Sequence, residues 1–256
     1  MGRNNLFRAI FLAGVVLPAL LLLMLSVGRE GVFPGILPGS FTFRNWADLL
    51  KGGGDLGSGL VLNLILSAVV AVLATGLGFL TARLVQNRSV LLLAYLPYAL
   101  SPVVYAVLLY VFFIRLGLSG NVAGVVLGQL LLAYPFAVIF FRSFWGLQAT
   151  RYEQLALTLG CTPWQALRKV LIPVARPALV ICFFQTFLIS WFEFGLTNLI
   201  GIGKVKTLTV QVFVYIQEAN IHYAALAALL LVIPPVVLLL ANRRFVFGGG
   251  EDLLIR

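Results

Sequence analysis

Long apolar segments separated by short polar ones make up most of this chain. Four of them contain no Asp, Glu, Lys or Arg over 20 or more residues, a fifth contains Glu193, and a sixth contains the single histidine, His222. Twenty helical residues, at about 1.5 Å each, cross a hydrocarbon core of roughly 30 Å. Because lipid offers the backbone no hydrogen bonds, and the sequence lacks the alternating segments of a membrane barrel, the pattern predicts an all-α membrane protein. We expect six transmembrane helices, at about residues 9–28, 58–82, 89–114, 121–141, 177–200 and 220–241.

The composition agrees with this class. Hydrophobic residues make up 61% of the chain and charged residues 10%, with a mean hydropathy of +1.06. These values exclude a soluble globular domain and a disordered chain. The first segment has the basic flank of a signal peptide, but its apolar run exceeds the 7–15 residues of a signal-peptide core, so we expect it to remain as the first helix. A single transmembrane domain is expected over residues 1–256, with a short interfacial helix around Trp46 in the outer segment.

The most informative polar segment lies at about residues 150–173. Leu155 and Leu159 are four positions apart, which predicts a short helix with an apolar face. Gly160 follows, at a position where a helix end favours a residue that tolerates positive φ. The sequence therefore predicts a first short helix that ends in a tight corner.

A second short helix is predicted directly after this corner. Thr162 is a typical N-cap, Pro163 suits the first helical position, and Gln165 completes a capping box. We expect this helix to end near Leu171, because Pro173 cannot continue it. Such a pair of helices could be an amphipathic hairpin on the membrane surface, or a docking surface for a soluble partner. A helix-turn-helix that reads DNA is disfavoured, because hydrophobic spans flank the segment.

The segment resembles the EAA loop of binding-protein-dependent ABC importer permeases, whose pattern is E-A-A, three residues, Gly, nine residues and I-x-L-P. Here this becomes Gln154-Leu155-Ala156, three residues, Gly160, nine residues and Val170-Leu171-Ile172-Pro173. Gln154 and Leu155 depart from the family's Glu and first Ala, and Glu153 comes one position early. The resemblance in layout covers essentially the whole chain and implies the permease of a type I importer.

The resemblance also implies the partners of the chain. In this family the loop is a cytoplasmic coupling helix, between helices 4 and 5, that binds in a cleft of an ATPase. The residues implied to make this contact are Glu153, Gln154, Leu155, Ala156, Gly160, Thr162, Pro163 and Trp164. A second permease subunit, identical or homologous, two ATP-binding subunits and a periplasmic or lipid-anchored solute-binding protein are implied with it. ATP and Mg²⁺ would bind the ATPase, and no cofactor is expected in this chain.

The basic residues predict the orientation in the membrane. With both termini cytoplasmic, the inner segments contain 12 Lys and Arg residues and the outer segments six. The inner residues are Arg3, Arg8, Arg83, Arg88, Arg142, Arg151, Arg168, Lys169, Arg176, Arg243, Arg244 and Arg256, and the outer residues are Arg29, Arg44, Lys51, Arg115, Lys204 and Lys206. This split predicts a multi-pass protein of the bacterial inner membrane with the 150–173 loop in the cytoplasm. It also accounts for most of the net charge of +10 without a nucleic-acid partner.

The sequence contains no recognisable catalytic or metal-binding pattern. Gly201-Ile202-Gly203-Lys204 lacks the spacing and the hydroxyl of a phosphate-binding loop, and Cys161 and Cys182 form no disulfide framework. ATP hydrolysis would therefore require a separate subunit. The alternative function is a secondary transporter or channel that works without ATP, and it predicts ionisable residues paired across several helices. A membrane-embedded enzyme is disfavoured because no catalytic constellation is found.

Glu193 is the single acidic residue within a predicted span. Intramembrane carboxylates are costly and usually face a cavity or a partner. Glu193 could line a solute pathway, where its charge would favour a cationic solute or hold a gate. Alternatively, it could bind a cation at a helix end or in an outer loop, or be hydrated near the outer surface. The stretch around it resembles the S-x-D/E-F-G-x-T segment of polyamine, iron(III) and thiamine permeases. This resemblance implies a pathway role for Glu193, with Trp191 and Asn198 as further candidates.

The other polar residues of the spans are expected to join helices. Gln129 and several tyrosines, among them Tyr98 and Tyr105, are predicted to form interhelical hydrogen bonds. Gly124 and Gly128 form a small-xxx-small face suited to close helix packing.

Overall fold

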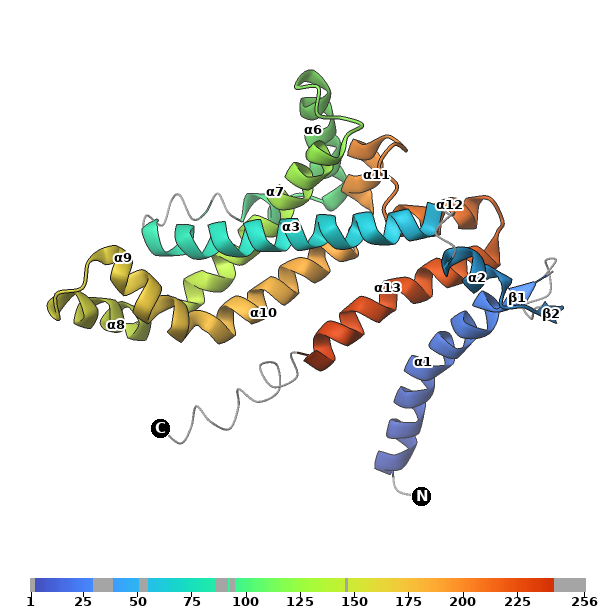
Figure 1. Cartoon of the computed structure of the whole chain (residues 1–256), viewed down its shortest axis with the longest axis horizontal. Coiled ribbons are helices and arrows are strands. Elements are labelled where there is room, and N and C mark those ends of the chain that lie inside the picture. The colour runs from blue at the N-terminus through green and yellow to red at the C-terminus, as the bar shows by residue number, and fades with distance from the viewer. Residues whose placement is uncertain are drawn as a thin grey trace. The chain divides into compact units, whose positions relative to one another are not determined.

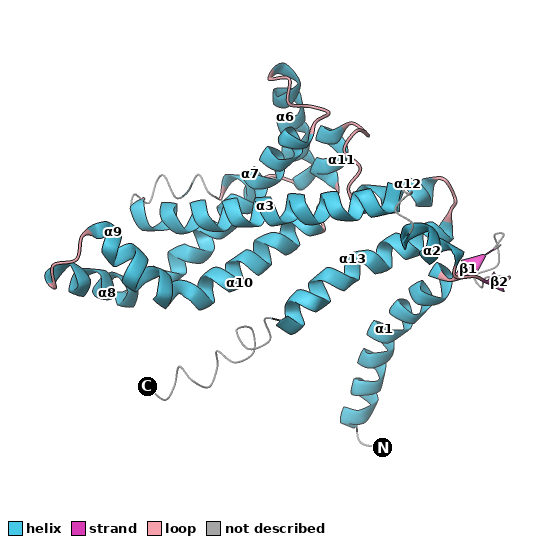
Figure 2. Cartoon of the chain, in the orientation of Figure 1, coloured by secondary structure: helices cyan, strands magenta, loops and turns pink. Residues whose placement is uncertain are grey.

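The computed structural model describes residues 3–29, 39–50, 55–85, 92, 95–145 and 147–241. Nearly all of these residues are helical (Figure 2). The chain divides into two compact units: residues 1–63 with 206–236, and residues 64–205 with 237–256. Helices α3 (Asp55–Leu84) and α13 (Ile221–Ala241) contribute to both units.

The first unit contains the outer segment of the chain. Its elements are α1 (Arg3–Ser26), β1 (Gly28–Arg29), β2 (Ser40–Phe41), α2 (Arg44–Leu50), the start of α3, α12 (Leu208–Gln217) and most of α13 (Figure 1). The short helix predicted around Trp46 is confirmed as α2. Asn45 Nδ2 donates to the carbonyls of Ser26 at 3.1 Å and Gly28 at 3.2 Å, which fastens α2 to the end of α1.

Three elements of this unit were not predicted, namely β1, β2 and α12. The antiparallel pair of β1 and β2 aligns Gly28 with Phe41 and Arg29 with Ser40. Two-residue strands leave too few alternating positions for a sequence pattern to show. Helix α12 was not among the six predicted helices. Its ten residues are too few to form a membrane span, and the prediction considered apolar segments of about 20 residues.

The second unit contains the middle of α3, α5 (Leu96–Ala99), α6 (Pro102–Arg115), α7 (Val122–Phe144) and α8 (Leu147–Thr158). It continues with α9 (Pro163–Ala166), the π-helix η1 (Leu167–Leu171), α10 (Ile172–Trp191) and α11 (Gly195–Gly201) (Figure 1). Helix α11 packs against α6 and α7. The absence of side chains at Gly124 and Gly128 permits this contact, because a Cβ added at Gly128 would lie 2.6 Å from Ile200 Cδ1. The predicted small-residue face is confirmed.

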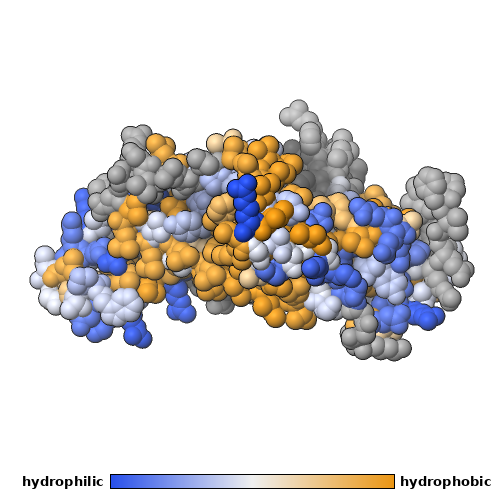
Figure 3. Space-filling model, turned by 90° about the horizontal axis from the view of Figure 1, so that it is seen from above, coloured by the Kyte–Doolittle hydropathy of each residue, from blue (hydrophilic) through white to orange (hydrophobic). Residues whose placement is uncertain are grey.

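Four helical segments of the described chain are long and apolar enough to cross a membrane: Asp55–Leu84, Val122–Phe144, Pro163–Trp191 and Ile221–Leu240. Val16–Ser26, Pro102–Arg115 and Leu208–Gln217 are apolar but shorter. Hydrophobic side chains cover much of the described surface on the face shown in Figure 3, as expected where lipid replaces water. The chain is therefore a multi-pass membrane protein, and the count of six spans stays a prediction.

The helices expected at 58–82, 121–141 and 220–241 are confirmed as α3, α7 and α13. The first, expected at 9–28, begins earlier, at Arg3, and ends at Ser26. The continuous helix expected at 89–114 is wrong in its described part, because the chain is extended at Leu100 and Ser101, with ψ of 148° and 136°. Pro102 disfavours helical geometry at the residue before it, which explains the break.

The helix expected at 177–200 is also wrong in its bounds. It begins much earlier, since α9, η1 and α10 form one helical stretch, and it is interrupted between Trp191 and Gly195. The second loop helix therefore does not end before Pro173. At η1 the amide of Ile172 donates to the carbonyl of Leu167, one residue further back than in an α-helix. This wider turn accommodates Pro173, the next residue, which has no N–H to donate.

Candidate functional site

The corner of the 147–171 loop has the local geometry that its sequence predicts. Gly160 has a φ of +87°. Its amide donates to Leu157 O at 3.0 Å, and the amide of Cys161 donates to Ala156 O at 3.0 Å, so the last carbonyls of α8 are satisfied. Thr162 Oγ1 accepts from the Gln165 amide at 3.3 Å, and Gln165 Oε1 accepts from the Thr162 amide at 3.0 Å. The capping box and the positive φ are both confirmed, and they make the corner a defined shape.

Large apolar side chains point outward from this loop. Leu155 is 58% exposed, Leu159 76% and Trp164 67%. Leu155 lies on α8, Leu159 directly follows the end of α8, and Trp164 lies on α9. The two helices lie side by side (Figure 1). We call Leu155, Leu159 and Trp164 the exposed apolar patch. Bulky hydrophobic groups on an otherwise polar loop are typical of a binding surface, because their exposure to water costs free energy.

The inward face of the loop is packed on the rest of its unit. Ala166, Leu167 and Leu171 are buried, and the last two belong to a cluster with Phe79 and Phe141. The Phe79 and Phe141 rings meet edge to face with centroids 5.2 Å apart. An ion pair between Arg83 and Glu153 joins α3 to α8. The loop is therefore held on the ends of α3, α7 and α10.

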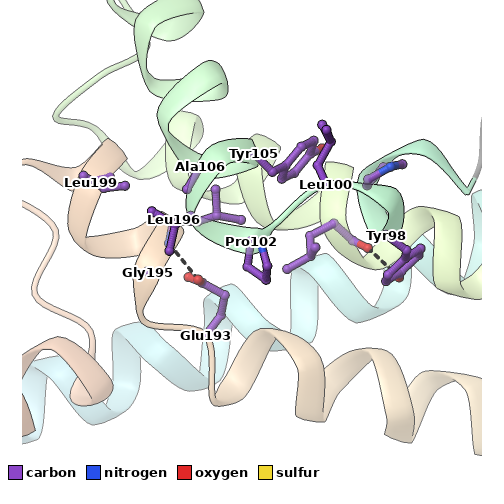
Figure 4. A pocket seen from close by; sticks show the side chains of 12 residues that line it. Tyr98, Leu100, Pro102, Tyr105, Ala106, Glu193, Gly195, Leu196 and Leu199 are labelled. Atoms are coloured by element: carbon purple, nitrogen blue, oxygen red, sulfur yellow. Dashed lines mark hydrogen bonds between the residues drawn. The ribbon is translucent and has the colours of Figure 1, made fainter.

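A cavity of about 380 Å³ lies where two helical segments are interrupted. One interruption separates α5 from α6 and the other separates α10 from α11, and both contribute lining residues (Figure 4). The lining is mostly apolar, with Tyr98, Tyr105 and Glu193 as its polar side chains. Its size falls in the range of small-molecule sites.

Both tyrosine hydroxyls at the cavity are bonded to the backbone of α7. Tyr98 Oη donates to Leu132 O at 3.0 Å, and Tyr105 Oη donates to Leu131 O at 3.3 Å. Pro135 lies four residues after Leu131 and has no N–H, so Tyr105 replaces the helical donor that this carbonyl lacks. The predicted interhelical role of these tyrosines is confirmed.

Glu193 binds the N-terminal turn of α11. Its Oε1 accepts from the Leu196 amide at 2.7 Å, and its Oε2 accepts from the Thr197 amide at 2.9 Å and from Thr197 Oγ1 at 2.8 Å. The chain of bonds continues inward, since Gln129 Nε2 donates to Thr197 Oγ1 at 2.8 Å and Ser190 Oγ donates to Gln129 Oε1. The positive end of the helix and its first amides thus stabilise the carboxylate, a contact that the sequence had not predicted.

A model of the family described as "Binding-protein-dependent transport system inner membrane component" matches residues 74–246. The chain belongs to this family. The match includes both the loop and the residues that line the cavity. Within the described residues of this permease, no three His, Cys, Asp or Glu side chains are placed to hold a metal ion.

Several permeases are similar over different lengths. The trehalose transport system permease protein SugB of Mycobacterium tuberculosis is 29% identical over 163 residues, covering 61% of this chain and 59% of that protein. The diacetylchitobiose uptake system permease protein NgcG of Streptomyces coelicolor is 28% identical over 228 residues, covering 84% and 74%. The maltose/maltodextrin transport system permease protein MalG of Salmonella typhimurium is 26% identical over 252 residues, covering 88% and 84%. The chain thus spans less than two thirds of SugB and most of MalG.

The fold is shared with a solved transporter. A bacterial ABC transporter involved in the import of the acidic polysaccharide alginate has a chain that superposes with a TM-score of 0.64 and 17% identity, over 95% of each chain. At this identity the likeness concerns the fold alone.

The structure places the predicted loop residues of the permease together. Six of the eight are exposed: Gln154, Leu155, Gly160, Thr162, Pro163 and Trp164. Ala156 is buried, and Glu153 is partly buried in its ion pair. The exposed residues can therefore meet a partner directly, whereas Ala156 and Glu153 face the permease itself.

The three predicted pathway residues do not come together. Glu193 lines the cavity, Trp191 is fully buried and stacks on Phe187 with ring centroids 5.6 Å apart, and Asn198 is exposed and does not line the cavity. Sequence reasoning did not place Tyr98 and Tyr105 at a cavity. Pro97 and Pro102 could have indicated the cavity, because two prolines this close together interrupt a helical span and leave space between helices.

Proposed function

We propose that this permease is the membrane-spanning subunit of an ATP-driven ABC importer and that its 147–171 loop is the docking site of a cytoplasmic ATP-binding subunit. The observation that carries the proposal is the exposed apolar patch at a capped corner, in a chain of the permease family. A partner that buries Leu159 and Trp164 would regain the free energy that their exposure costs.

The working assembly follows from the family. Two permeases, identical or homologous, would enclose the solute pathway, and two ATP-binding subunits carrying ATP and Mg²⁺ would dock on their loops. A periplasmic or lipid-anchored binding protein would deliver solute from the outside. Closure of the ATP-binding subunits would draw the loops together and turn the pathway outward by rigid-body motion. The chain itself would not be an enzyme.

The class of solute is a separate matter. The relatives named above are permeases for trehalose, diacetylchitobiose and maltose or maltodextrin, so they lend no support to a cationic solute. Three hydrogen-bond donors already surround the Glu193 carboxylate, which weakens its attraction for a cation. A polyamine, iron(III) or thiamine-like solute stays a prediction, and a Glu193 variant tests it below.

Replacing Leu159 or Trp164 with Asp is expected to abolish docking of the ATP-binding subunit. A charge in the centre of the patch would have to be desolvated on binding, which costs several kcal/mol if it stays unpaired. The measurement is the amount of ATP-binding subunit that co-purifies with the tagged permease. Ser143→Asp adds the same charge at an exposed position on the last turn of α7, outside the loop, and is the matched control. Undiminished co-purification in both patch variants would contradict the proposed site.

Cysteine labelling is expected to show both termini and the loop on the cytoplasmic side. In a Cys161→Ser background, cysteines at Arg44 and Lys204 should react with an impermeant maleimide added outside intact cells, and a cysteine at Arg168 should react only after the membrane is opened. The three positions are exposed, so their accessibility depends on the side of the membrane. Labelling at Arg168 from outside would overturn the orientation.

A further inference from the structure

Glu153 is the one acidic residue of the 147–171 loop, and it points into the permease. Arg83 Nε donates to Glu153 Oε1 at 3.2 Å, and Arg83 Nη2 donates to the same oxygen. The two side chains are 15% and 22% exposed. An ion pair partly shielded from water in this way is stronger than a surface pair, because solvent screens it less.

The ion pair of Arg83 and Glu153 joins the loop to α3, a helix of 30 residues. Arg83 lies in the last turn of α3, 70 positions before Glu153 in the sequence. Further along α3, Thr81 Oγ1 accepts from Tyr134 Oη of α7 at 2.9 Å, and Thr75 Oγ1 bonds with Thr186 Oγ1 of α10 at 3.2 Å. The ion pair would therefore transmit a displacement of α8 to α3. The hydrogen bonds of α3 would transmit it further, to α7 and α10.

The exposure of the residues next to Glu153 shows which face of α8 is turned to the permease and which is turned away from it. Ala156, three positions on, is buried, whereas Gln154 and Leu155 are exposed. Positions three apart share a helix face. Glu153 and Ala156 thus form the face turned to the permease, and a partner bound to Leu155 would approach from the opposite side.

We propose that Glu153 is a positioning residue that couples the loop to α3 through Arg83 and does not contact the ATP-binding subunit. The proposal rests on the proposed function, because it concerns how motion of a docked loop enters the membrane helices. An inward ion pair suits this role, because it resists separation of α8 from α3 while the exposed apolar patch remains available for docking.

The first test uses the isolated permease in nanodiscs, with a nitroxide spin label on Cys161. This native cysteine lies in the corner and is partly exposed, while Cys182 is buried. Glu153→Gln and Arg83→Gln are each expected to increase the mobility of the label, and the exchange of charges, Arg83→Glu with Glu153→Arg, is expected to restore it. Arg142→Gln is the control, because Arg142 donates to Val85 O at 3.3 Å, beside the end of α3 and outside the loop.

The second test uses the assembled complex with ATP as the probe. Both single variants are expected to bind the ATP-binding subunit with unchanged stoichiometry and unchanged KM for ATP, and to lower kcat for hydrolysis by about fivefold or more, the lower end of typical coupling effects. The charge exchange is expected to recover most of kcat. A residue important for folding alone would reduce the amount of complex and leave the kcat of the remaining complex unchanged.

Two results would overturn the proposal. If Glu153→Gln weakens binding of the ATP-binding subunit and Arg83→Gln does not, then Glu153 contacts that subunit directly. If the single variants change neither label mobility nor kcat, the ion pair does not couple the loop to α3. If the wild-type permease binds no ATP-binding subunit, the proposed function is wrong, and the spin label on the isolated chain still decides whether the pair holds the loop on α3.

Discussion

Gly160→Val is expected to insert normally into the membrane and to lose ATP-driven coupling. Gly160 has a φ of +87°, where a β-branched residue is strained by about 1–3 kcal/mol. Among the described residues, no atom outside the immediate chain neighbours lies within 4 Å of a Cβ added there, so the cost is backbone strain and not a clash. The corner would relax to negative φ and change the angle between α8 and α9, which would displace Leu159 relative to Trp164.

The measurement is ATP hydrolysis and transport by the assembled complex, together with the amount of permease in the membrane. Hydrolysis and transport are expected to fall together by about fivefold or more, with unchanged insertion. Gly160→Asn is the matched control, because Asn tolerates positive φ far better than valine, and it should retain most activity. Normal coupling in Gly160→Val would show that the corner is not part of the coupling interface.

Glu193→Gln is expected to destabilise the permease. The carboxylate accepts three hydrogen bonds from the first turn of α11, and a glutamine keeps one acceptor oxygen while its NH₂ group would face an amide donor. Losing acceptors for amides at a partly buried helix end costs about 1–3 kcal/mol. For a chain of this length that corresponds to roughly 2–4 °C in melting temperature per kcal/mol.

Melting temperature and transport measured on the same preparation separate the roles of Glu193. A lower melting temperature, with transport unchanged per folded molecule, identifies a helix cap. Weaker transport of a cationic solute at an unchanged melting temperature identifies a pathway contact, and no change in either leaves Glu193 as a hydrated surface residue. Glu218→Gln removes an exposed carboxylate and is the control for the loss of charge alone.

The sequence by itself determined the local structure of the loop. Gly160, Thr162, Pro163 and Gln165 specify the corner, because the positive φ and the capping box need only residues within a few positions of each other. Long charge-free segments likewise predicted α3, α7 and α13, since twenty apolar residues have few alternatives to a membrane helix.

Only the tertiary structure decided where the other spans are interrupted and which way the polar side chains of the site point. Helix α11 follows the break at Glu193 and packs its Ile200 beside Gly128 of α7, a residue 72 positions earlier. The long apolar run predicted a continuous helix through Glu193, because such a run contains no information about contacts between distant positions. The ion pair of Glu153 with Arg83 spans 70 positions in the same way. The family resemblance implied a solute contact for Glu193 and an ATPase contact for Glu153. In the structure Glu193 accepts from residues only three and four positions further on, which is a local contact. Glu153 binds Arg83, which only the tertiary fold brings close to a carboxylate that would be costly to bury unpaired.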